Sequence, residues 1–130
     1  MNQAVGVVLL SHSEELASGA AELVAQIGAV NVPVAVAGGD AKGGLGTSYH
    51  RIQEALEAAD RGVGLVVPPD LGSAVLMTRT VLEDHPHHDA VIVDAPFVEG
   101  AIAAAVAAAG GADLATVLAS AEKARSVRKF

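Results

Sequence analysis

The chain contains no cysteine and no tryptophan, and its aromatic residues are one tyrosine and two phenylalanines. The absence of cysteine excludes disulfide bonds, thiolate catalysis and cysteine-ligated zinc. No apolar run reaches the roughly 18 residues that a membrane-spanning helix needs. Because the N-terminus also lacks the basic segment of a secretory signal peptide, we expect a cytoplasmic protein.

Basic residues are also scarce. The 8 lysines and arginines face 15 aspartates and glutamates, which gives a formal net charge of -7. Nucleic acids and anionic membranes bind to clustered lysine and arginine, so we expect neither as a partner. Four of the basic residues lie at the C-terminal end, where they fit a solvated terminus better than a docking segment. They are Lys123, Arg125, Arg128 and Lys129.

Apolar residues make up 52% of the 130 positions, enough for the core of one domain spanning residues 1–130. Short apolar runs alternate with segments whose apolar residues recur at helical spacing. The predicted strands are Val5–Leu10, Val32–Ala37, Val63–Val67 and Ala90–Val93. The predicted helices are Glu14–Ile27, Tyr49–Asp60, Ser73–Glu83, Phe97–Ala109 and Leu114–Ala124. This alternation indicates an α/β fold with an open, mainly parallel sheet of four or five strands and helices on both faces.

Polar residues and glycines follow the predicted strands. They form Ser11–Ser13, Gly38–Ser48, Asp70–Ser73 and Asp94. The carboxyl ends of parallel strands meet at one edge of the sheet, and ligands bind there in open α/β sheets. We therefore expect the functional site at this edge.

His12 stands between the first predicted strand and the first predicted helix. Ser11 and Glu14 fit a capping box, and Ser13 is a competing N-cap. Either arrangement places the imidazole at the positive end of a helix, where an added anion such as a phosphoryl group is stabilised. The alternative is a histidine in a capping region with no chemical role.

Asp70 follows the third predicted strand, which in such sheets commonly lies beside the first. Its carboxylate could bind one imidazole nitrogen of His12 and leave the other free to react. The alternative is that Asp70 caps the helix that begins at Ser73. A Ser-His-Asp hydrolase is disfavoured because the chain has no Gly-x-Ser-x-Gly motif.

Two glycine-containing turns, Gly43–Ser48 and Gly72-Ser73, could present N–H groups to a phosphate. Neither matches a nucleotide-binding motif, so we expect no cofactor. His85, His87 and His88 precede the fourth strand, at the edge opposite His12. We interpret them as a surface loop rather than a metal site, because only Asp84 and Asp89 lie nearby in sequence.

Five segments occur in order over about the first 120 residues: Val8–Ser13 (VLLSHS), Leu45–Ser48 (LGTS), Asp70–Leu76 (DLGSAVL), Ala95–Gly100 (APFVEG) and Gly110–Leu114 (GGADL). With them the chain resembles the phosphotransferase subunits of phosphoenolpyruvate-dependent dihydroxyacetone kinases. More widely, it is similar to the enzyme IIA domains of the mannose class of the bacterial sugar phosphotransferase system. Pro68 and Pro69 stand where the resemblance leads us to expect an apolar pair.

The resemblance implies that His12 is the phosphorylated histidine and that Asp70 is its hydrogen-bond partner. It implies a phosphoryl-binding set at the same edge, made of Ser13, Gly46, Thr47, Gly72 and Ser73. The implied phosphoryl donor is the carrier protein HPr, and the implied acceptor is ADP bound on a dihydroxyacetone kinase subunit. The resemblance also implies a homodimer, for which the alanine-rich segment Phe97–Ala109 offers a surface with few charges. A sugar-transport enzyme IIA domain and a regulatory binding module without turnover are the alternative functions.

Overall fold

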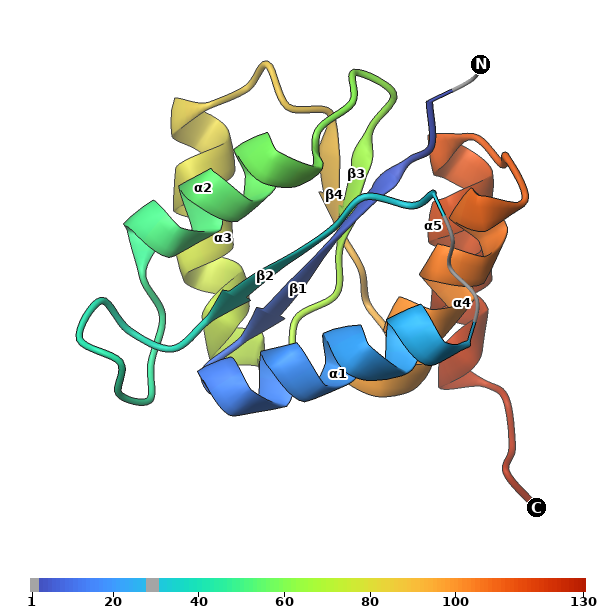
Figure 1. Ribbon diagram of the computed structural model, residues 1–130, viewed down its shortest axis with the longest axis horizontal. Helices are drawn as coiled ribbons and strands as arrows, with labels where there is room; N and C mark the ends of the chain where they lie inside the picture. The colour runs from blue at the N-terminus through green and yellow to red at the C-terminus, as the bar shows by residue number, and fades with distance from the viewer. Residues whose placement is uncertain (1–2, 28–30) are drawn as a thin grey trace.

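The computed structural model describes residues 3–27 and 31–130 (Figure 1). Its strands are β1 (Gly6–Ser11), β2 (Val34–Gly38), β3 (Leu65–Val67) and β4 (Ala90–Ile92). Its helices are α1 (Glu14–Gln26), α2 (Tyr49–Ala59), α3 (Gly72–Asp84), α4 (Phe97–Ala109) and α5 (Leu114–Glu122), followed by a 3-10 turn at Lys123–Arg125. The predicted element boundaries differ from these by no more than about two residues. No helix in the described part of the chain combines the length and apolar character that crossing a membrane requires.

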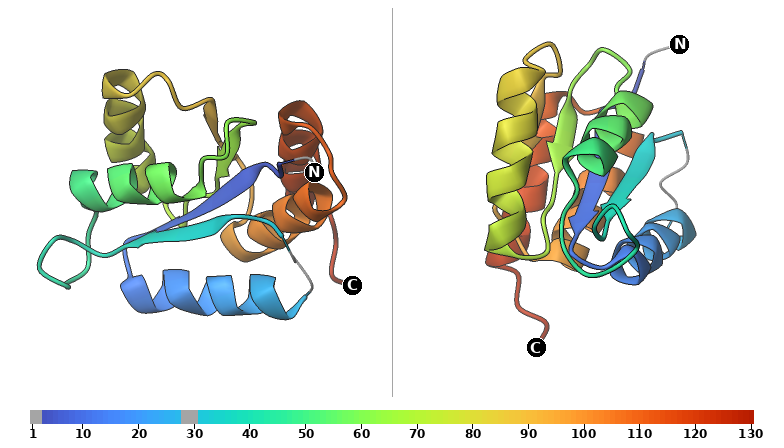
Figure 2. Two further views of the ribbon diagram at one scale, coloured as in Figure 1. Left: turned by 45° about the horizontal axis from the view of Figure 1, so that its top comes forward. Right: turned by 90° about the vertical axis from the view of Figure 1, so that its left-hand side faces the viewer.

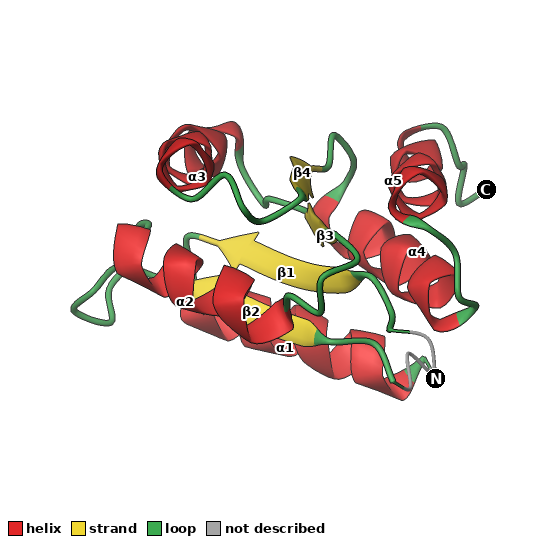
Figure 3. Ribbon diagram, turned by 90° about the horizontal axis from the view of Figure 1, so that it is seen from above, coloured by secondary structure: helices red, strands yellow, loops and turns green. Residues whose placement is uncertain are grey.

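The strands of the described residues form one parallel sheet in the order β2-β1-β3-β4, which confirms the predicted architecture (Figure 3). β1 is central: Val7 is in register with Val34 of β2 and with Val66 of β3. β2 is an edge strand, and Pro33 immediately precedes it, as a residue without a backbone N–H permits. All four strands therefore end at the same edge.

Alternate residues of β1 supply the core on both faces of the sheet. Val7 and Leu9 pack into the cluster that includes α1, α4 and α5, whereas Val8 and Leu10 pack against α2 and α3. The left view of Figure 2 shows the sheet between α2 and α1. These four side chains are no more than 1% exposed, and burying a side chain of this kind contributes about 1.5–3 kcal/mol. A strand apolar at consecutive positions fits a sheet covered on both faces.

One face of α4 lies inside the domain, so the expected surface with few charges is confined to the opposite face of the helix. Ala101, Ala104, Ala105 and Ala108 are buried in the core cluster with residues of the sheet and α5. Small side chains allow α4 to approach α5 closely, and the spacing of the four alanines places them on one helix face. The opposite face includes the exposed Val106 and Ala109, and the homodimer stays a prediction.

Gly38 sets the distance between the end of β2 and the beginning of α1. A Cβ atom at this position would lie 2.6 Å from the Cα of Glu14 and 3.0 Å from the carbonyl oxygen of Ser13. Both contacts are with backbone, so relief would require α1 to move. Glycine at this position therefore holds the first turn of α1 against the sheet edge.

We predict that Gly38→Ala lowers the free energy of unfolding by about 1–3 kcal/mol, because overpacking against backbone cannot be relieved by a side-chain rotation. Gly19→Ala is the matched control. A Cβ atom at Gly19, within α1, would meet nothing within 4 Å, so alanine should raise stability by about 0.5–1 kcal/mol. Urea unfolding of both variants measures the effects, and equal stabilities would contradict the proposed constraint.

Candidate active site

Asp70 reaches His12 because the pairing of β1 with the chain beyond β3 continues through Pro68 and Pro69. The N–H of Leu10 donates to the carbonyl oxygen of Pro68 (3.2 Å), and the N–H of Asp70 donates to the carbonyl oxygen of Leu10 (2.9 Å). The prolines therefore do not interrupt the parallel pairing at this point, since it needs only the carbonyl group of Pro68. Asp70 and His12 emerge side by side at the carboxyl edge of the sheet.

The carboxylate of Asp70 accepts two hydrogen bonds on each oxygen. Oδ1 lies 3.0 Å from Nδ1 of His12 and 2.7 Å from the N–H of Leu71. Oδ2 accepts from the backbone N–H of His12 at 3.0 Å and from the hydroxyl of Ser11 at 2.9 Å. Burial raises the pKa of Asp70, but the hydrogen bonds from His12, Ser11 and Leu71 outweigh burial and hold the pKa below its ordinary value of 3.8. Asp70 is therefore ionised at neutral pH.

The interpretation of Asp70 as a helix cap is wrong. The N-cap residue of α3 is Leu71, and that end of the helix has no side-chain cap. Because an ionised carboxylate only accepts hydrogen bonds, Nδ1 of His12 carries a proton, and in the neutral ring Nε2 is then the nitrogen with the lone pair. The hydroxyl of Ser73 lies 2.8 Å from Nε2 and donates to it in that neutral form. The imidazole is thus held with its nucleophilic nitrogen toward the beginning of α3.

Of the two N-cap candidates, Ser13 rather than Ser11 caps α1. Its hydroxyl accepts from the N–H of Leu16 at 3.2 Å, and Ser13 has the extended backbone of an N-cap. Ser11 instead accepts from the N–H of Ser13 at 3.0 Å. His12 therefore lies one residue before the N-cap, beside the positive end of the helix.

The glycine turns contribute unequally to this site. The N–H of Gly46 donates to the backbone carbonyl of His12 at 2.9 Å, which fixes the loop after β2 against the histidine. Thr47 is half-buried and forms no hydrogen bond with His12 in the described part of the chain. Gly72 is the first residue of α3, is exposed, and has open space where a Cβ atom would lie. Together with Ser73 it offers an uncovered helix N-terminus near Nε2.

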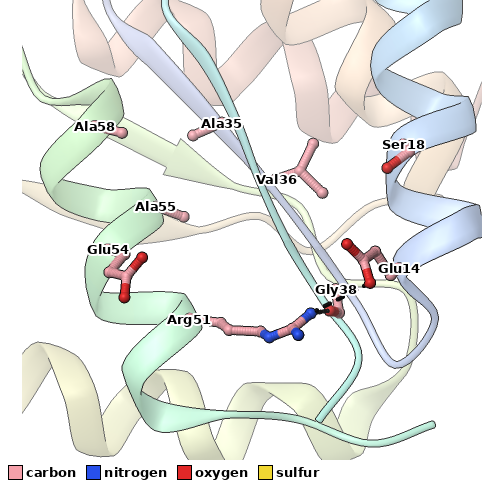
Figure 4. Close-up of a pocket in the computed structure, with 9 residues that line it drawn as sticks. All are labelled: Glu14, Ser18, Ala35, Val36, Gly38, Arg51, Glu54, Ala55 and Ala58. Carbon is pink, nitrogen blue, oxygen red and sulfur yellow. Dashed lines mark hydrogen bonds and ion pairs between the residues drawn. The ribbon is translucent and has the colours of Figure 1, made fainter. Parts of the chain in front are cut away.

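Arg51 lines a groove beside β2, between α1 and α2 (Figure 4). His12 does not line this groove. Nη1 of Arg51 donates to the carbonyl oxygen of Gly38 at 2.8 Å and lies 3.4 Å from Oε2 of Glu14. Arg51 therefore connects α2, the end of β2 and the first turn of α1. Neither Arg51 nor the bridging role of Ser11 was predicted, because both depend on contacts between distant segments. The one sequence signal that marks Ser11 is its place directly after the apolar run Val5–Leu10.

A second histidine–carboxylate pair lies at the opposite edge of the sheet. Nδ1 of His88 is 2.6 Å from Oδ2 of Asp60, the C-cap of α2. The expectation of a surface loop holds for the exposed His87 but is wrong for His88, whose side chain is only 4% exposed because it packs onto this carboxylate. Its Nε2 is buried without a hydrogen-bond partner among the described residues. By contrast, the side chain of His12 is 23% exposed, so of these two rings it is His12 that solvent and partners can reach.

No three histidine, aspartate or glutamate side chains are grouped so as to hold a metal ion within residues 3–27 and 31–130. At the carboxyl edge the structure brings together the imidazole of His12, its carboxylate partner Asp70 and the donors at the beginning of α3. An oriented nucleophilic nitrogen beside an uncovered helix N-terminus suits the transfer of an anionic group.

Residues 6–118 match the model of the family described as "PTS system fructose IIA component" (EIIA-man). The chain belongs to the EIIA-man family. It is 37% identical over 120 residues to the phosphoryl donor subunit DhaM of the PEP-dependent dihydroxyacetone kinase of Escherichia coli, covering 88% of the chain and 25% of the relative. It is 32% identical over 118 residues to the DhaM phosphotransferase subunit of the PTS-dependent dihydroxyacetone kinase of Lactococcus lactis, covering 91% and 94%.

The fold agrees with a solved structure as well. A crystal structure described as a protein of unknown function superimposes with a TM-score of 0.84 at 30% identity, covering 98% of each chain. Relatives in this group differ in length, since the chain spans about a quarter of the E. coli protein but nearly all of the L. lactis protein. The fold described above is therefore shared across the whole chain.

We predict that Asp70→Asn slows the phosphorylation of His12 by the small donor phosphoramidate on the order of tenfold or more, because the amide can donate to Nδ1 and favour the wrong tautomer. Rates are measured with ³²P-labelled or mass-resolved product, and ¹⁵N NMR reports the ring tautomer. Asp60→Asn is the matched control: it removes the carboxylate of the second pair and should lower stability but not the rate. An Asp70→Asn variant with a normal rate would contradict the orienting role.

Proposed function

We propose that this EIIA-man domain is a phosphohistidine carrier. Nε2 of His12 accepts a phosphoryl group from phosphorylated HPr and passes it to ADP bound on a dihydroxyacetone kinase subunit. The observation that carries the proposal is the contact between Asp70 and Nδ1 of His12, which leaves Nε2 as an oriented and accessible nucleophile. The printed names of the relatives, a phosphoryl donor subunit and a phosphotransferase subunit, support the direction of transfer.

The local geometry suggests how each residue acts during transfer. The lone pair of Nε2 attacks phosphorus, the bond between phosphorus and the donor breaks, and the Nδ1 proton stays in its hydrogen bond to Asp70. Once Nε2 is bonded to phosphorus it no longer accepts from Ser73, so this hydroxyl turns to a phosphoryl oxygen. The N–H groups of Gly72 and Ser73 face the same added charge. In the second step a β-phosphate oxygen of ADP attacks phosphorus, and the imidazole leaves as the neutral ring.

Exposed leucines around His12 favour proteins, rather than small molecules, as donor and acceptor. Leu45 is 80% exposed and adjoins Gly46, which binds the backbone of His12. Leu71, 58% exposed, adjoins Asp70, and Leu76, 68% exposed, lies one helical turn after Ser73. Leu16 is 45% exposed in the first turn of α1, next to the acidic Glu14 and Glu15. Exposed apolar side chains gathered around a reactive group are typical of protein interfaces, and the acidic rim suits a basic partner surface.

Transfer between purified proteins tests the function. We predict that the phosphorylated chain transfers to a kinase subunit carrying ADP and forms ATP there, and that His12→Gln loses all acid-labile label supplied by phosphorylated HPr. His88→Gln is the control and should keep its label, because the ring of His88 is buried. Rapid transfer to a mannose-class enzyme IIB domain, with none to ADP, would assign the chain to sugar transport instead. A chain that takes no label from HPr would support a binding module.

The leucine surface yields a separate prediction. Replacing Leu45 and Leu76 together with glutamine should raise the KM for phosphorylated HPr by about tenfold, since the loss of two interface side chains commonly costs 1 kcal/mol or more. Phosphorylation by phosphoramidate, which needs no protein contact, should be unchanged. Leu23→Gln is the matched control, because Leu23 is 46% exposed near the other end of α1. An unchanged KM in the double variant would remove these leucines from the interface.

A further inference from the structure

Ser11 is the last residue of β1 and the one polar residue in a strand that is otherwise apolar. It is 1% exposed, and its backbone is fixed because its carbonyl oxygen accepts from the N–H of Gly39 at 3.1 Å. The side chain therefore projects from a rigid position in the centre of the sheet edge. Its hydroxyl forms two hydrogen bonds, one to Asp70 and one from Ser13.

The direction of the hydroxyl proton follows from these two contacts. The N–H of Ser13 occupies a lone pair of the Ser11 oxygen at 3.0 Å, so the single hydroxyl proton points to Oδ2 of Asp70 at 2.9 Å. The result is a chain of hydrogen bonds from the N-terminus of α1 through Ser11 to the carboxylate. Bonds in such a chain polarise one another, which strengthens the contact with an ionised acceptor.

We propose that Ser11 is a positioning residue: its hydroxyl fixes the plane of the Asp70 carboxylate against the His12 ring and so maintains the Nδ1-protonated tautomer. Among the described residues, two side chains donate to this carboxylate, the imidazole of His12 and the hydroxyl of Ser11. The other two donors are the backbone N–H groups of His12 and Leu71. Without the Ser11 hydroxyl, Oδ2 keeps one partner and the carboxylate is freer to rotate about its Cβ–Cγ bond. The consequence for transfer rate rests on the proposed function of His12, whereas the consequence for the tautomer does not.

A purely structural role for Ser11 would be to satisfy the part-buried N–H of Ser13 at the beginning of α1. That role predicts a loss of stability but no change in the His12 ring or in Asp70. The positioning role predicts a change in both. The hydrogen bond from Ser11 is one of the causes that lower the pKa of Asp70, so its removal should raise that pKa.

The test compares Ser11→Ala and Ser11→Thr with the wild-type chain. Thr78→Val is the matched control, because Thr78 is a fully buried residue whose hydroxyl donates to the carbonyl of Ala74 at 2.9 Å, away from the dyad. The readouts are the tautomer of His12 by ¹⁵N NMR, the titration of the Asp70 carboxyl carbon by ¹³C NMR, and the rate of phosphorylation by phosphoramidate and by phosphorylated HPr. Thermal unfolding gives the stability of each variant.

Ser11→Ala should reduce the population of the Nδ1-protonated tautomer, raise the pKa of Asp70 and slow both phosphorylation reactions on the order of tenfold. Ser11→Thr should restore all three, since it keeps the hydroxyl. Thr78→Val should lower the melting temperature alone. A Ser11→Ala variant that melts earlier but keeps the wild-type tautomer and Asp70 titration would overturn the proposal. If wild-type His12 takes no phosphoryl group from HPr, the proposed function fails, but the NMR comparison still decides the role of Ser11.

Discussion

Leu10 forms two backbone hydrogen bonds with the segment after β3, and the active site depends on them. They extend the parallel pairing beyond the three residues of β3 and deliver Asp70 to the same edge at which β1 ends. Because α1 and α3 also begin at this edge, the imidazole of His12, its carboxylate partner and two helix N-termini meet in one place. A change in the register of β1 against β3 would move Asp70 away from His12 and separate all these groups.

Access to the ring, rather than the histidine–carboxylate contact itself, distinguishes the pair proposed to react from the buried pair. His12 with Asp70 and His88 with Asp60 share the contact between Nδ1 and a carboxylate. The first pair lies at the carboxyl edge with Nε2 toward the exposed beginning of α3, whereas the second ties the end of α2 to the loop before β4. The second pair therefore stabilises the amino edge of the sheet, and the carboxyl edge remains available for chemistry.

Most of the fold could be predicted because its signals are local. Consecutive apolar residues in Val5–Leu10 indicate a strand buried on both faces. Asp113 directly precedes an apolar helical segment and caps α5, accepting from the N–H of Thr116, as aspartate commonly does at this position. Three features could not be predicted in this way. Four alanines of Phe97–Ala109 are buried in the core, His88 lies inside rather than on the surface, and Ser13 is the one of the two N-cap candidates that caps α1. Each outcome depends on a neighbour distant in sequence.

The sequence by itself determined the class of fold and the sheet edge that carries the site, and it named His12 and Asp70 as a candidate pair. It could do so because periodicity and strand order constrain where polar residues can gather. Only the tertiary structure decided which imidazole nitrogen is free, which serine caps and which bridges, and which histidine is accessible. These properties follow from ångström-scale distances between β1, the turn after β3 and the beginning of α3. Hydrogen-bond direction and burial depend on such distances, and no local pattern of residues encodes them.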